Sequence, residues 1–191
     1  MHKCGTPTDH VSPRKGETPM STTLAELIEG ITGRINTHLA TSGSDTSQAR
    51  ALLADFGRVS HLDHQARVPM SDGLQRQGDV LVVPASMVTD YQGPDCTDGN
   101  RVPLGGVPVV RGEAGGNTHA LHGDGTVFFE TREPVIDRDT RKLAIGVLDV
   151  PEGATAYLFH PEHGALGLLP GCYEVRRQSE GFGAELALVA D

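Results

Sequence analysis

Tryptophan is absent from the 191-residue chain, and aromatic residues make up only 4% of it. Basic residues are also scarce, because 16 lysines and arginines face 25 aspartates and glutamates, which gives a formal net charge of −9. Nucleic-acid binding needs clustered basic side chains for the phosphates, and single strands also need exposed aromatic rings for base stacking. The composition therefore argues against nucleic acid as a partner.

Long apolar runs are absent as well. No run approaches the roughly 20 residues that a helix needs to cross a bilayer, and residues 1–19 lack the apolar core of a secretory signal. The only cysteines, Cys4, Cys96 and Cys172, are far apart and form no Cys-x-x-Cys motif. Such spacing is typical of unpaired thiols in a reducing compartment. We therefore expect a cytoplasmic protein that does not bind a membrane.

Turn-forming residues, by contrast, are plentiful: the chain has 24 glycines and 12 prolines. Many tight turns imply short strands rather than long helices. The apolar segments that we expect to form strands are 78–86, 107–116, 117–122, 126–130, 142–150, 154–160 and 164–178. The segments 117–122 and 126–130 flank Gly123-Asp124-Gly125, which predicts a β-hairpin. The pattern as a whole predicts a mainly β domain over 69–191, either a compact β-barrel or a sandwich.

The N-terminal third has a different texture. Residues 1–19 are polar and unpatterned, which predicts a disordered leader. Within 20–68 we expect a helical hairpin or arm, because apolar residues recur at helical spacing from Leu24 to Leu39 behind a Ser/Thr cap and again over 47–59. Such an arm can pack on its own domain or on a neighbouring subunit. The second arrangement predicts a homo-oligomer, or a protein partner that docks on the helices.

Six of the nine histidines form three H-x-x-H pairs. The pairs are His61/His64, His119/His122 and His160/His163. A spacing of three places two side chains on one face of a helix but on opposite faces of a strand. The first pair lies in a polar stretch, for which solvation is favoured over metal binding. In the second pair only one histidine can face the interior; Leu121 shares the face of His119, so we expect His119 inside and His122 on the surface.

The third pair lies in the segment "HPEH". Pro161 favours a four-residue turn, and such a turn brings its first and last residues, His160 and His163, close together. With His119 as a third ligand and Glu162 or Glu130 as a general base, these residues predict an open metal site of the catalytic kind, for zinc or non-haem iron. The alternative interpretation is that the histidines bond the turn or lie on the surface.

Two stretches carry a resemblance to a known group. The segments "GGNTHALH" and "YLFHPEHGALGLLPGCYEVRRQ" resemble those of small, poorly characterised bacterial proteins, in which a G-H-x-H segment precedes H-E-E-H and an L-P-x-G-x-Y-x-V-x-x-Q strand. The resemblance covers roughly residues 78–178 and implies no particular reaction. This chain has Asn117 in place of the first histidine and Pro161 in place of a glutamate. If the group binds one metal with four histidines, this chain has one ligand fewer.

The order of histidine hairpin, Glu130, "VPEG" turn and His160 is also similar to a cupin barrel, although the spacing differs. Two functions are therefore open. One is a metal-dependent enzyme or metal-binding protein that uses His119, His160 and His163, and the other is a non-enzymatic subunit that self-assembles or docks a partner. The sequence decides neither whether the protein is an enzyme nor which substrate it uses.

Overall fold

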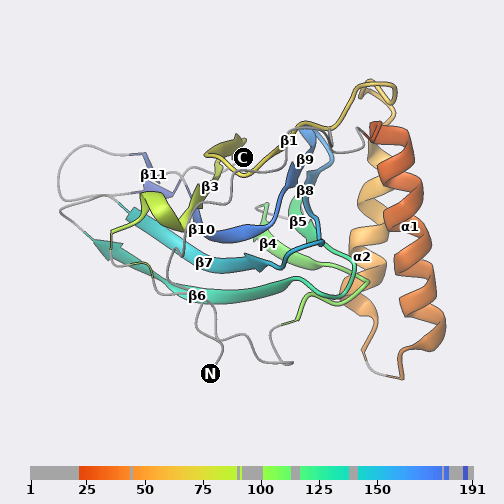
Figure 1. The fold of residues 1–191 in the computed structure, drawn as a ribbon. Coiled ribbons are helices and arrows are strands. Elements are labelled where there is room, and N and C mark those ends of the chain that lie inside the picture. The colour runs from red at the N-terminus through yellow and green to blue at the C-terminus, as the bar shows by residue number, and fades with distance from the viewer. Residues whose placement is uncertain are drawn as a thin grey trace.

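A computed structural model gives the arrangement of the chain (Figure 1). It describes residues 22–43, 45–89, 91, 101–112, 117–137, 142–177, 179–180 and 187–188. The predicted leader over 1–19 lies outside the described residues. No helix among the described residues is long and apolar enough to cross a membrane.

The predicted N-terminal helices are present. α1 covers Leu24–Thr41, α2 covers Ser47–Asp55, and a 3₁₀ turn, η1 (Phe56–Arg58), follows directly. Thr23 and Glu26 form a capping box, in which the Thr23 hydroxyl accepts from the Glu26 backbone N–H and the Glu26 carboxylate accepts from the Thr23 backbone N–H. This box satisfies N–H groups that the first turn leaves without helical partners.

Ten strands form two five-stranded sheets. The first sheet has the order β1 (Met70–Ser71), β9 (Gly164–Leu168), β8 (Ala156–His160), β5 (Thr118–His122) and β4 (Val107–Arg111). The second has the order β2 (Gln75–Gln77), β3 (Val80–Pro84), β10 (Gly171–Arg177), β7 (Lys142–Val150) and β6 (Phe128–Asp137). A 3₁₀ turn, η2 (Ala85–Met87), follows β3, and the short strands β11 (Ser179–Glu180) and β12 (Ala187–Leu188) pair separately.

The mainly β class with N-terminal helices is thus confirmed, in its sandwich form. The two sheets do not close into a barrel, and therefore the cupin-like alternative is not adopted. The β-hairpin over 117–130 was a wrong prediction. β5 pairs with β4 and β8 in the first sheet, whereas β6 pairs with β7 in the second, so the Gly123-Asp124-Gly125 segment crosses between the sheets.

An apolar core fills the space between the sheets. Its fully buried members include Val80 on β3, Leu148 on β7, Leu168 on β9 and Tyr173 on β10. The phenol O–H of Tyr173 donates to the Leu169 carbonyl at 2.6 Å, and burial raises the pKa of this phenol. The apolar face of each sheet is therefore shielded from water by the other sheet.

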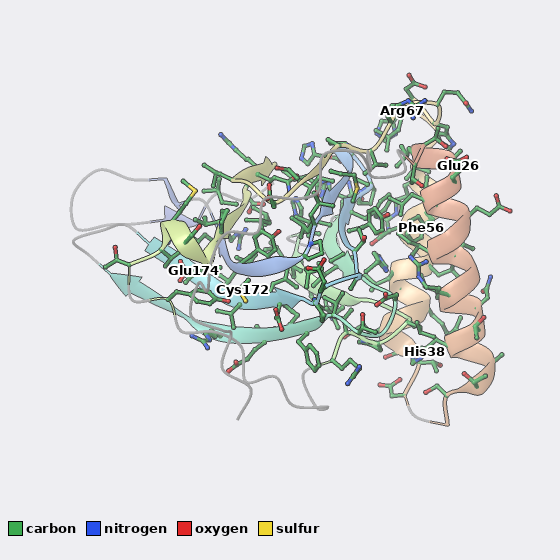
Figure 2. The ribbon with its side chains drawn as sticks, viewed as in Figure 1. Glu26, His38, Phe56, Arg67, Cys172 and Glu174 are labelled. Carbon is green, nitrogen blue, oxygen red and sulfur yellow. The ribbon has the colours of Figure 1, made fainter. Side chains whose placement is uncertain are left out.

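The helices cover the outer face of the first sheet, and they stand side by side along one flank of the molecule (Figure 1). Ile31 and Ile35 of α1 are fully buried in a second apolar cluster that includes Tyr157 and Ala165 of the sheet. Phe56 lies at the boundary between helices and sheet in Figure 2, and its ring centroid is 4.4 Å from that of Phe159. The helical arm therefore packs on its own domain, and both faces of this sheet are buried.

Candidate metal centre

The interior of the sandwich changes from apolar to polar at one end. On β5, β8 and β10 a polar side chain lies two positions from an interior-facing apolar residue: His119 before Leu121, His160 after Leu158 and Arg177 after Val175. The buried polar residues at this end are His119 on β5, His160 on β8, Gln77 on β2 and Asp79 just before β3, with Arg177 at the end of β10. Because strand residues alternate between faces, these side chains point toward the same space between the sheets.

The "HPEH" segment forms the loop of the β8–β9 hairpin. His160 pairs with Gly164, and residues 161–163 form the turn between them. Gly164 has φ of 76°, the left-handed conformation that closes a three-residue hairpin loop and that glycine adopts without steric cost. The sequence therefore predicted a turn here correctly, and the hairpin fixes where both histidines lie.

His119 reaches this turn from the neighbouring strand. β5 and β8 pair Ala120 with Phe159, and extending this register by one residue sets His119 opposite His160. The ring centroids of His119 and His160 are 4.2 Å apart, and those of His160 and His163 are 4.6 Å apart. The His119 and His163 centroids are separated by 6.1 Å. Three imidazoles therefore form one stack at the end of the sandwich.

Glu162 adds a carboxylate to this group. One ligand atom from each of His160, Glu162 and His163 lies within 4.8 Å of the others, and His119 adjoins this trio through its contact with His160. The backbone N–H of Glu162 donates to Nδ1 of His160 at 3.2 Å, so this nitrogen carries the lone pair. His119 and His160 are each 2% exposed, whereas His163 and Glu162 are exposed. The cluster thus has a buried half and a half open to solvent.

A buried ion pair lies behind His119. Asp79 accepts a hydrogen bond from Nε of Arg177 at 2.7 Å, and its other oxygen lies 3.7 Å from Nδ1 of His119. The second distance exceeds a hydrogen bond and represents an electrostatic contact. It favours a proton on Nδ1 and directs the lone pair of His119 to Nε2. Metal-binding imidazoles usually have a carboxylate or carbonyl at the ring nitrogen that does not bind the metal.

The helical part also contacts the centre. Arg58 of η1 donates to Oδ1 of Asn117 at 2.9 Å, and Nδ2 of Asn117 donates to Glu162 at 2.6 Å. Arg58 also pairs with Asp55 at 3.4 Å. Burial raises the pKa of Asp55, and the Arg58 charge opposes this rise. The chain from Arg58 through Asn117 holds the Glu162 carboxylate near the histidines.

The structure places two residues, Glu130 and His122, where the sequence analysis did not expect them. Glu130 lies on β6, which forms one edge of the second sheet, while β2 forms the other edge. There Glu130 forms an ion pair with Arg132 at 3.5 Å. It is not brought to the cluster. His122 was wrongly predicted to lie on the surface, since it is 1% exposed. The helices cover the sheet face that His122 occupies, and the strand pattern could not reveal this cover.

His122 has an environment unlike that of the clustered histidines. Neither of its ring nitrogens has a hydrogen-bond partner among the described residues, and its ring centroid lies 5.8 Å from that of Phe56. Desolvation, followed by the nearby charge of Arg34, lowers its pKa to about 3. His122 is therefore a neutral packing residue. In the first pair, His64 contacts the Val59 carbonyl through Nε2 at 2.9 Å, and His61 is exposed.

Three functional candidates escaped the sequence analysis, namely Asp79, Arg177 and Arg58. A weak signal existed for two of them. Asp79 directly precedes the buried strand "VLVV", and Arg177 has the same alternation parity as the buried Tyr173 and Val175. A charged side chain at an interior position is uncommon and needs a partner of opposite charge. Each of these two positions therefore indicated that an oppositely charged side chain lies nearby. Only the pairing of β3 with β10 shows that each is the counter-charge of the other.

Comparison with known proteins identifies the family. The chain belongs to the family described as Domain of unknown function (DUF8820), which matches residues 76–178. The matched range includes the three clustered histidines, Asp79 and Arg177, and it leaves out the helices. No curated protein and no solved structure matches the chain. The predicted membership of a poorly characterised family is thus confirmed.

Proposed function

We propose that this domain binds a divalent transition metal, zinc or iron, at the polar end of the sandwich. His119, His160 and His163 are the proposed ligands, and the gathering of their rings beside the Glu162 carboxylate is the observation that carries the proposal. A metal bound by His160 would replace the hydrogen bond that Nδ1 of His160 accepts from the Glu162 backbone N–H. Imidazole nitrogens with a carboxylate are the donor set that zinc and non-haem iron accept.

The proposed ligand atoms lie near one another, but farther apart than the ligand atoms of a bound metal. Zinc–nitrogen bonds of 2.0–2.1 Å in a tetrahedral site put ligand atoms about 3.4 Å apart. The ligand atoms of His160, Glu162 and His163 lie within 4.8 Å of one another and must therefore move closer, and His119 would have to join them from outside this group. His163 is exposed and sits on a turn, so its side chain can rotate at low cost, whereas Asn117 holds the exposed Glu162 carboxylate beside it. His119 and His160 are buried on paired strands and form the rigid half.

Glu162 has two roles open to it. It can be the fourth ligand, since its carboxylate lies within reach of His160 and His163. It can also act as a general base if a water molecule takes the fourth position of the metal. The hydrogen bond from Asn117 positions the carboxylate for either role.

Metal content tests the proposal directly. The protein is purified without a histidine tag, loaded with zinc or iron, dialysed and analysed for metal per chain. We expect about one metal per wild-type chain, and its loss in a His160→Ala/His163→Ala variant. Equal metal content in that variant and in the wild type contradicts the proposal.

The first histidine pair supplies a matched control. His61→Ala/His64→Ala removes the same residue types at the same spacing from a loop outside the ring stack. We expect this variant to keep its metal. Loss of metal in both double variants would indicate damage to the fold or a different site.

The assembly role predicted for the helices gains no further support. The apolar face of α1 is buried against the first sheet of the same chain. The oligomeric state therefore stays a prediction, for which light scattering on the intact protein is the measurement.

A further inference from the structure

A groove of about 420 Å³ opens beside His163. One wall is formed by Gln75, Arg76 and Gly78 at the end of β2, and the other by His163, Ala165 and Leu166 at the start of β9. Pockets for small molecules typically have volumes of about 300–1,000 Å³. The groove thus has the size of a small-ligand site and reaches the exposed ligand of the proposed metal centre.

The lining of the groove carries a positive charge, in contrast to the chain as a whole, and the Glu162 carboxylate borders it at His163. The protein carries a formal charge of −9, yet no aspartate or glutamate is among the described residues that line this groove. Arg76 supplies a positive charge there, and its Nε donates to the Gly78 carbonyl at 2.9 Å. Among the described residues Arg76 forms no ion pair with a carboxylate. The guanidinium is therefore held in place with its terminal nitrogens available to an anion.

The remaining lining determines which kind of anion fits. Pro69, Ala165 and Leu166 give the groove an apolar part, and Gln75 donates its side-chain N–H groups to the carbonyls of Ser71 and Gly167. One guanidinium beside apolar side chains suits a carboxylate on a short hydrocarbon body better than it suits a phosphate, which needs more donors.

We infer that the groove binds a small organic carboxylate, with Arg76 pairing to the carboxylate and the ligand's hydrocarbon body lying on Pro69, Ala165 and Leu166. The inference rests on the proposed metal for a second attraction, since a metal at His163 would add positive charge at the same end of the groove as the carboxylate. Arg76 is a specificity-determining residue in this scheme, because it selects an anion over a neutral ligand.

Nuclear magnetic resonance titration of zinc-loaded protein with acetate, butanoate and butanamide tests the inference. We expect butanoate to bind more tightly than acetate, by roughly fourfold for each buried methylene. Butanamide should not bind at matched concentrations. Arg76→Gln should weaken butanoate binding by roughly 10- to 100-fold, because a charge-assisted hydrogen bond is lost. Arg50→Gln, on the exposed face of α2, is the matched control and should bind like the wild type.

A second titration with metal-free protein separates the two proposals. Arg76-dependent butanoate binding by metal-free protein upholds the groove, and if the same protein takes up no zinc on loading, the metal centre is overturned. Zinc bound at one per chain together with no butanoate binding upholds the centre and overturns the groove. Equal binding of butanoate by wild type and Arg76→Gln, or equal binding of butanamide and butanoate, also overturns the groove.

Discussion

At the scale of single residues, neighbours rather than residue type determine what each histidine can do. His119 and His122 lie on one strand, three residues apart, and both are buried. His119 faces the other clustered imidazoles and a carboxylate, whereas His122 faces the apolar helices. The first environment gives the imidazole polar partners, and the second keeps it uncharged.

The buried His122 makes the stability of the protein depend on pH. Its pKa is about 3 in the folded protein and 6.5 in an unperturbed state. Below pH 6.5 the unfolded chain gains a proton here that the folded chain does not, so the free energy of unfolding falls as pH decreases toward 3. Between pH 7 and pH 5 we expect a loss of about 2 kcal/mol from this group. Urea unfolding at the two pH values measures it.

Substitution of His122 by leucine isolates the contribution of this residue to the pH dependence of stability. His122→Leu removes the titrating group and keeps an apolar side chain in the same space. The difference in unfolding free energy between pH 7 and pH 5 should be smaller in His122→Leu by about the same 2 kcal/mol. Identical pH dependence in the two proteins would show that His122 is not the source.

At the scale of elements, patterns within a few neighbouring residues predicted the helices and turns well. The same patterns predicted poorly which strands pair with each other. The capping residues Thr23 and Glu26 and the Pro161 turn act within a few residues, so the sequence displays their whole cause. The segment after β5 carries an equally clear turn signal, yet it crosses between the sheets. A turn shows that the chain changes direction, but strand pairing depends on distant segments such as β8.

The β8–β9 hairpin links backbone geometry to the metal centre. Gly164 has φ of 76°, and Gly153, in the turn before β8, has φ of 81°. Alanine at either position adopts a left-handed conformation, which should lower the free energy of unfolding by about 1–2 kcal/mol. Only Gly164→Ala alters the turn that carries His160 and His163. We therefore expect weaker zinc binding in Gly164→Ala alone, with urea unfolding and zinc titration as the measurements.

Gly153→Ala is the matched control for backbone strain, because no atom lies within 4 Å of the added methyl group. If both variants bind zinc like the wild type, the turn geometry does not set metal affinity. If both lose zinc, reduced stability is the cause rather than the turn.

At the scale of the whole molecule, the candidate centre spans both sheets. His119 and His160 belong to the first sheet, whereas Arg177 belongs to the second and Asp79 to the turn between its strands β2 and β3. The buried Asp79–Arg177 pair joins β3 to β10, and its contact with His119 joins the sheets. Metal binding should therefore stabilise the folded sandwich rather than a local loop.

Thermal unfolding measures this effect. Free zinc at 100 times its dissociation constant adds about 2.7 kcal/mol to the stability of the folded state. In a domain of this size such a gain raises the melting temperature by roughly 5–10 °C. A chelator should reverse the shift, and the His160→Ala/His163→Ala variant should not show it. An equal shift in that variant would place the zinc elsewhere.

The sequence by itself determined the local and compositional features. It predicted the β class, the two helices, the turn at Pro161 and the membership of a poorly characterised family, because each depends on nearby residues or on composition. It also selected His119, His160 and His163 as candidates. Their approach to one another depends on the pairing of β5 with β8, which sets Ala120 opposite Phe159.

Only the tertiary structure decided which charges meet and which faces are covered. The Asp79–Arg177 pair arises from strands almost 100 residues apart, and the burial of His122 arises from helices that pack on the outer face of its sheet. Both outcomes depend on how the sheets and helices stack, and neither strand alternation nor turn chemistry contains that information. The same stacking sets the polar end of the sandwich, and with it the candidate metal centre.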